Sequence, residues 1–217
     1  MVKVERSSIA PASLEKEKLN KSNKYGEKDV IHQLKKDFNG KCYLCEIDKL
    51  QSAEVEHLKP HHGTDRDLMF DWNNLFYCCS HCNSMKNKKE YEENIIDCCK
   101  TEPEKYISQN YKEGHVSVKP LNDTKEAEVT AKLIEECFEK RNTGIREIEC
   151  DTRVEALQET MNTLHKTLQK YKENPNKRYM GALRGMLNRG YKFAGFTRTY
   201  VREHIEDYPE LEEYIRL

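Results

Sequence analysis

The sequence predicts a mostly helical α+β fold, and three observations lead to this prediction. The chain has 217 residues, of which 36% are hydrophobic and 35% are charged, a polar composition that suits helices around a thin core. Two Cys-x-x-Cys pairs enclose two short strand candidates, one of them rich in aromatic and thiol side chains. Beyond residue 122, apolar residues recur at helical spacing. This length allows one or two domains.

The first 27 residues are expected to form a polar N-terminal arm. Ser, Asn and Lys are in excess there, and Pro11 falls early in the segment. Such an arm could dock a partner, and a disordered terminus is an equally good interpretation. Asn39 and Gly40 should end the first helix, which is predicted over residues 28–38 from the spacing of Val30, Ile31, Leu34 and Phe38.

A domain over residues 28–100 is predicted around the two cysteine pairs. Residues 41–46 should form a tight turn that presents two thiolates. Strands are expected at residues 53–58 and 75–79, separated by a polar loop. A helix is then expected from Ser80, a suitable N-cap, to about Asn94. The order is therefore turn, strand, loop, strand, turn and helix.

The C-terminal region, residues 101–217, is predicted to be mainly helical and to bind substrate or a partner. Residues 95–120 suggest a helical turn followed by a short strand or hairpin. Asp123 or Thr124 should cap a helix, and a break at residues 142–144 should precede a longer one. The longer helix carries one heptad-like stripe, which indicates packing against a neighbouring helix, at Leu157, Met161, Leu164, Leu168 and Tyr171.

The chain is expected to finish with short helices. Asn174 and Pro175 should end the long helix, because proline cannot continue it. Further helices are predicted around residues 178–188, 196–205 and 209–216.

The cysteines predict a metal site. Nine cysteines, an odd number, in a chain without a recognisable signal peptide favour metal over disulfides. Four thiolates suit a tetrahedral Zn²⁺ and leave no position open for catalysis, so this zinc should be structural. Cys78 competes with Cys79, but strand alternation directs it to the other face, and His81 is a weaker alternative. The predicted ligands are Cys42, Cys45, Cys79 and Cys82.

The residues between and after the cysteine pairs predict the hydrolysis of a phosphodiester. This reaction needs a base that activates water, a cation that stabilises the transition state, and positive charge near the phosphate. Glu56 and the amide of Asn83 offer hard oxygen ligands that suit Mg²⁺ or Mn²⁺. His57 leaves the strand in a different direction from Glu56, so it can act as the base.

Other polar residues are expected to support this site. Asn74 is placed to hydrogen-bond across the loop and hold His57 in position. Lys86 lies three residues after Asn83 on the same helix face and can reach a phosphate. His61 and His62 are interpreted as solvated loop residues, although either could touch the phosphate.

These motifs resemble the HNH (ββα-metal) endonuclease family in its zinc-stabilised form. The resemblance covers residues 41–89 and rests on C-x-x-C, V-E-H-L-K-P, W-N-N-L and C-x-x-C-N-x-x-K. The family letters fall on His57, Asn74 and Asn83, and Glu56 stands where many members have Asp. The resemblance implies a small zinc-stabilised ββα-metal core, nuclease activity and a catalytic divalent cation.

Within that family, C-Y-L-C-E and E-H-L-K-P-H look closer to the PtuB-like nucleases of Septu and related retron anti-phage systems. That branch typically has E-H-F-R-P-K, from which Leu58, Lys59 and His61 depart. The resemblance implies a DNA-cleaving effector gated by a PtuA-like ATPase partner in a hetero-oligomer. An effector that cleaves RNA or tRNA, and a non-catalytic zinc-scaffolded module that binds nucleic acid or protein, remain open alternatives.

Charge and hydropathy restrict the partners and the compartment. The net charge is −1, so the surface as a whole does not attract nucleic acid, yet residues 174–202 carry seven basic and no acidic side chains. This basic stretch could contact nucleic acid or an acidic partner, and its aromatic residues suit base stacking or a helical core. No apolar run reaches membrane-spanning length, so a cytoplasmic protein is expected.

Overall fold

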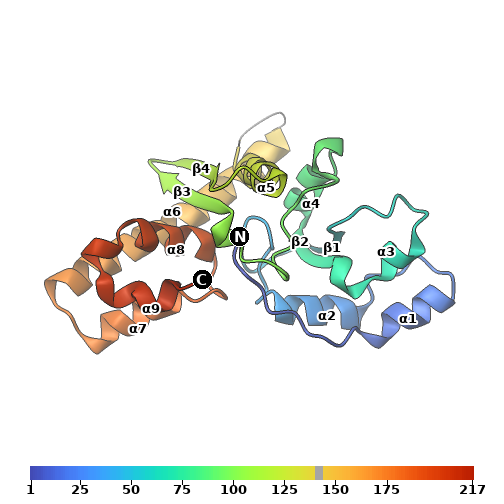
Figure 1. Cartoon of the computed structure of the whole chain (residues 1–217), viewed down its shortest axis with the longest axis horizontal. Coiled ribbons are helices and arrows are strands. Elements are labelled where there is room, and N and C mark those ends of the chain that lie inside the picture. Colours follow the sequence, from blue (N-terminus) through green and yellow to red (C-terminus); the bar gives the residue numbers. More distant parts are fainter. Residues whose placement is uncertain (140–143) are drawn as a thin grey trace.

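The computed structural model describes residues 1–139 and 144–217. Figure 1 shows two lobes, with the first helices and strands in one lobe and the last helices in the other. Helices make up 51% of the structure and the strands form two small sheets, which confirms the mostly helical α+β class. Among the described helices, none combines the length and apolar character needed to cross a membrane.

The N-terminal lobe is built on a strand–strand–helix unit. β1 (Ala53–His57) pairs antiparallel with β2 (Leu75–Cys79), in a register that places Glu56 opposite Phe76. α4 (Ser80–Lys86) follows β2 without a loop. The remaining elements of this lobe are α1 (Ala12–Leu19), α2 (Lys28–Asp37), α3 (Arg66–Phe70) and a 3₁₀ turn over Trp72–Asn74.

The helix after the second cysteine pair is shorter than the sequence predicted. α4 ends at Lys86, and a 3₁₀ turn over Lys89–Tyr91 follows. The reason is that residues 87–90 bury no side chain that would hold a further helical turn against the core. The N-cap is also Cys79 and not Ser80, since the Cys79 sulfur accepts the backbone N–H of Cys82.

The N-terminal segment is packed into the core. Val4 donates its backbone N–H to the carbonyl of Cys98 at 2.9 Å. The Arg6 guanidinium donates to the carbonyls of Trp72 and Leu75, the latter at 2.6 Å, and lies 4.8 Å from the ring centroid of Phe76. The sequence did not predict α1, in which only Leu14 is buried. A partner-docking arm, and domain boundaries near residues 27 and 100, stay predictions.

The C-terminal region contains the expected hairpin and helices. β3 (Ile107–Lys112) pairs antiparallel with β4 (His115–Pro120), and Thr124 caps α5 (Lys125–Glu136) by accepting the backbone N–H of Ala127. The predicted stripe on α6 (Gly144–Glu173) is buried at all five positions. Of the predicted break at residues 142–144, the first two positions lie outside the described residues. The chain then continues with α7 (Lys177–Met186), α8 (Ala194–Glu203), 3₁₀ turns over Ile205–Asp207 and Pro209–Leu211, and α9 (Glu212–Ile215).

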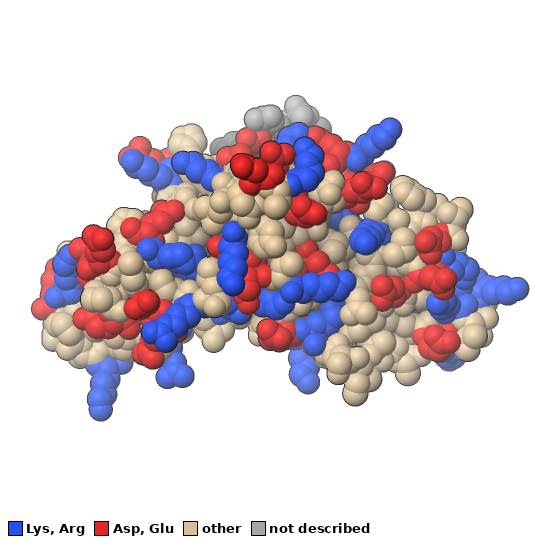
Figure 2. All heavy atoms as spheres, viewed as in Figure 1, with Lys and Arg blue, Asp and Glu red and all other residues tan. Residues whose placement is uncertain are grey.

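Part of the basic stretch serves the fold. Arg198 is 2% exposed, and both Arg198 and Arg202 bind one oxygen of Glu104, at 2.8 and 2.6 Å. Arg189 pairs with Glu102 at 2.7 Å. These acids belong to the 3₁₀ turn over Pro103–Lys105 and the residue before it, so the arginines tie that segment to the last helices. On the face drawn in Figure 2, basic and acidic side chains are interspersed.

The Arg6 contacts predict a measurable stability effect. Arg6→Leu removes two charge-assisted hydrogen bonds and leaves two carbonyl oxygens without that donor, which should cost about 2 kcal/mol. For a chain of this size that corresponds to a melting temperature lower by roughly 4–8 °C in a thermal-shift assay. Arg178→Leu, on the exposed face of α7, is the matched control and should melt like the wild type. Equal melting temperatures for the two variants would contradict the structural role of Arg6.

Candidate functional site

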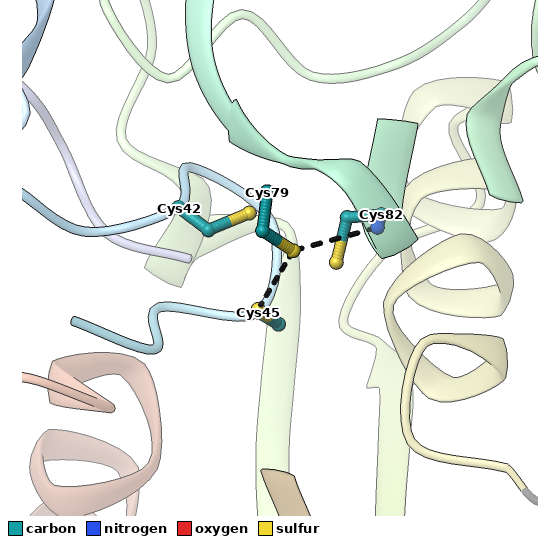
Figure 3. Close-up of side chains that lie close together, drawn as sticks. All are labelled: Cys42, Cys45, Cys79 and Cys82. Carbon is teal, nitrogen blue, oxygen red and sulfur yellow. Dashed lines mark hydrogen bonds between the residues drawn. The ribbon is translucent and has the colours of Figure 1, made fainter. Parts of the chain in front are cut away.

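Four buried cysteines form one cluster at the base of the strand–strand–helix unit (Figure 3). Two come from the turn after α2, one from the end of β2 and one from the first turn of α4, and their sulfur atoms all lie within 4.8 Å of one another. Four thiol donors in this arrangement fit a tetrahedral structural zinc. The cluster consists of the predicted residues Cys42, Cys45, Cys79 and Cys82.

The competing ligands lie outside this cluster. Cys78 precedes Cys79 on β2, and its sulfur reaches Cys42 at 3.8 Å without joining the group of four. His81 turns toward α6, where its Nδ1 lies 2.7 Å from Glu149 Oε2 and its Nε2 lies 3.1 Å from the Cys137 carbonyl oxygen. The imidazole of His81 therefore connects α4 with α6 and with the end of α5.

A cavity of about 410 Å³ opens beside β1 and the second half of α4. Its lining includes four of the five residues predicted for catalysis, Glu56, His57, Asn83 and Lys86. Asn74 is buried behind the loop and does not line it. The fold thus brings together side chains from residues 56–57 and 83–86, while Asn74 acts from outside the cavity.

His57 is held by one backbone carbonyl. Its Nε2 lies 3.1 Å from the carbonyl oxygen of Met69. Because that oxygen can only accept, Nε2 is assigned the proton and Nδ1 keeps a free lone pair. Burial lowers the pKa of His57 to about 4, with nearby His61 and Lys86 acting in the same direction. The imidazole is therefore neutral near pH 7 and can accept a proton at Nδ1.

Asn74 fastens the loop that carries this carbonyl. Its Oδ1 accepts the backbone N–H of Lys59 at 2.8 Å, and its Nδ2 donates to the carbonyls of Lys59 and Leu68 at 2.9 and 3.0 Å. Leu68 directly precedes Met69, whose carbonyl orients His57. Asn74 hence supports His57 through the loop, without touching the imidazole.

Lys86 points inward. Its Nζ lies 2.9 Å from Glu56 Oε1 and 3.0 Å from the carbonyl oxygen of His57, and it is 4% exposed. Tyr43 donates its hydroxyl to Glu56 Oε2 at 2.9 Å. Burial raises the pKa of Glu56, and the Lys86 ammonium opposes that rise. Sequence reasoning missed Tyr43, because nothing in its neighbourhood marks a partner thirteen residues away.

Asn83 and Glu56 share the cavity but have different partners. The Asn83 amide donates to the carboxylate of Glu54, which lies two residues before Glu56 on the same face of β1. The Oδ1 of Asn83 remains available as an acceptor. Asn87 also lines the cavity, one helical turn after Asn83. Glu54 and Asn87 were missed, although the strand period of two and the helix period of four could have indicated them.

The mouth of the cavity is aromatic. Tyr25, from the segment before α2, and His61, from the loop after β1, each place a ring 4.5 Å from the His57 ring, edge to face. His61 Nδ1 accepts the backbone N–H of Gly63 at 3.0 Å, so this ring is positioned and not freely solvated. His62 also lines the cavity but is exposed.

Comparison with known proteins finds a distant, partial similarity. No protein-family model matches the chain. Septu protein PtuB from Bacillus mycoides (strain KBAB4) is 35% identical over 81 residues, which cover 31% of this chain and 27% of PtuB. The chain therefore matches about a quarter of the length of this relative.

The cysteine cluster predicts a selective loss of metal. The wild-type chain should purify with about one zinc per chain. Cys79→Ala should lose it, because three thiolates no longer complete the site, and the variant should melt at a lower temperature. Cys78→Ala, the neighbouring buried cysteine, should keep its zinc, as measured by elemental analysis. Retention of zinc by Cys79→Ala, or its loss from Cys78→Ala only, would show that the ligand set is wrong.

Asn74 predicts a local effect on the loop. Asn74→Ala removes three hydrogen bonds, so local opening of residues 59–70 should become easier by about 1–3 kcal/mol. Amide hydrogen exchange in that segment should speed up at least about fivefold. Asn73→Ala changes an exposed neighbour and should leave the exchange unaltered. Identical exchange in the two variants would show that Asn74 does not anchor this loop.

Proposed function

We propose that this protein is a metal-dependent HNH endonuclease that hydrolyses phosphodiester bonds in nucleic acid. The observation that carries the proposal is the placement of His57, whose Nε2 faces one backbone carbonyl, in the same cavity as Glu56 and Asn83. The strand–strand–helix unit that holds these residues has the order which the family resemblance implied.

His57 is assigned the role of general base. Its Nδ1 takes a proton from a water molecule as that water oxygen attacks phosphorus. The bond between phosphorus and the leaving sugar oxygen breaks, and the leaving oxygen takes up a proton from solvent. Asn74 and the Met69 carbonyl hold the imidazole in the required tautomer and orientation.

Glu56 and Asn83 are assigned to the catalytic cation. A carboxylate and an amide oxygen on the wall of one cavity fit Mg²⁺ or Mn²⁺, which prefer oxygen donors. When bound, the cation would stabilise negative charge on the phosphate and on the leaving oxygen. Both oxygens of Glu56 already accept hydrogen bonds, so Lys86 must share this carboxylate or move away. Lys86 then offers its positive charge to the phosphate, the role predicted from the sequence.

The same geometry favours an enzyme over a binding module. A module that only binds nucleic acid gains nothing from a half-buried histidine whose proton is fixed on one nitrogen. A binder would instead expose its cations, whereas Lys86 is buried against Glu56. The zinc-scaffolded binding module is therefore the weaker candidate.

The biological setting is proposed from the partial similarity to Septu protein PtuB. We propose that the chain is the DNA-cleaving effector of a Septu-type two-component anti-phage system, gated by a PtuA-like ATPase partner. Co-purification from the native operon tests this part separately. Recovery of an ATPase with the chain supports the setting, and recovery of the chain alone counts against it while leaving the chemistry untouched.

The general-base assignment predicts the effect of one substitution. His57→Ala should lower the rate of metal-dependent plasmid cleavage by about 10²–10⁴-fold, the usual contribution of a positioned base. It should keep its zinc, because His57 is not part of the cysteine cluster. His32→Ala, on the exposed face of α2, is the control with unchanged activity. If the wild-type chain alone does not cleave the plasmid, the same comparison is made in the presence of the co-purified ATPase. Equal cleavage rates for His57→Ala and the wild type would refute the mechanism.

A further inference from the structure

A buried arginine from the C-terminal region reaches the cysteine cluster. Arg153 lies on α6, and its Nη2 is 3.3 Å from the sulfur of Cys79. The residue is 6% exposed. It was not singled out in the sequence, because 74 residues separate it from Cys79 and no motif surrounds it.

The charge of Arg153 has no carboxylate partner among the described residues. Its Nη1 donates to the backbone carbonyl of Glu149, one turn earlier in the same helix, at 2.5 Å. Its Nε is buried and has no hydrogen-bond partner. Within the described part of the chain, no Asp or Glu side chain forms an ion pair with it. A buried charge without a counter-charge costs several kcal/mol, so another anion is expected nearby.

The cysteine cluster can supply that anion. Four neutral thiols carry no charge, but four thiolates around one divalent ion carry a net charge of two minus. Cys79, the ligand that Arg153 contacts, is then part of an anionic centre. An N–H group that donates to a metal-bound thiolate is a common form of support for such centres.

A second contact joins this part of α6 to residues 79–82, which include Cys79. Glu149 lies one helical turn before Arg153, and its carboxylate accepts from His81 Nδ1 at 2.7 Å. Cys150, the next residue, donates its thiol to the carbonyl of Glu139 at 2.9 Å and lies 3.9 Å from the His81 ring. One face of α6 thus rests on residues 79–82, which contain two of the four predicted metal ligands.

We propose that Arg153 is the counter-charge of the anionic four-cysteine metal centre, and that metal binding and docking of the first half of α6 are coupled through it. Loss of the metal removes the anionic centre, which leaves the buried guanidinium without its counter-charge and favours release of this part of the helix. Linkage requires the reverse as well, so removal of the guanidinium must weaken metal binding. Arg153 is therefore a positioning residue that acts through the cluster, and this role is independent of the proposed nuclease chemistry.

Substitutions at Arg153 test the metal side of this coupling. Zinc release to a chromogenic chelator should be about 10–100-fold faster in Arg153→Met, the usual effect of removing an outer partner of a metal site. Arg153→Lys keeps the positive charge, so its zinc release should be nearly as slow as that of the wild type. Arg178→Met, on the exposed face of α7, is the matched control and should release zinc like the wild type. Release from Arg153→Met within twofold of the wild type would overturn the proposal.

Hydrogen exchange on the wild-type chain tests whether docking of the first half of α6 depends on the metal. This test does not require any variant to fold. After chelation, amides of residues 147–158 should exchange at least tenfold faster. Residues 161–171, whose apolar stripe packs in the core, should keep their protection. Unchanged exchange in residues 147–158, or an equal loss of protection across the whole chain, would overturn the local coupling.

Discussion

The burial of four thiols at one point is the constraint on which the N-terminal lobe depends. β1 and β2 have five residues each and α4 has seven, so this unit is too small to bury a stabilising core alone. The cluster joins the turn after α2 to the end of β2 and the start of α4. The side chains of the proposed active site either lie within a few residues of one of these cysteines or lie on β1, which pairs with β2.

The positions of the cysteines and the strands determine the geometry of the cavity. Cys79 ends β2 and caps α4, and Cys82 lies in the first turn of that helix, so Asn83 is delivered directly beside β1. On the other strand, the period of two turns Glu54 and Glu56 to one face. The loop between the strands needs its own anchor, and the buried amide of Asn74 provides it with three hydrogen bonds.

The sequence was most informative where spacing alone decides the geometry. The cysteine pairs, the strands around them, the Thr124 cap and the α6 stripe all follow from short periods, and the structure places them as predicted. Contacts between distant segments could not be obtained in this way. The spacing of Lys86 from Asn83 predicted a shared helix face, but it could not predict that Lys86 pairs with Glu56 across the unit. The basic stretch was open to nucleic acid or to an acidic partner, but Glu104 engages two of its arginines. Arg153 carried no signal, because its partner is a cluster assembled in three dimensions.

The inward position of Lys86 has a consequence for the order of events at the proposed active site. In the free protein the ammonium balances the charge of Glu56, so an incoming cation competes with a tethered ion that is always present. A phosphodiester offers the ammonium a second anion and thereby frees the carboxylate. Substrate and cation should therefore bind cooperatively, and the proposed site should hold little metal until a strand of nucleic acid arrives.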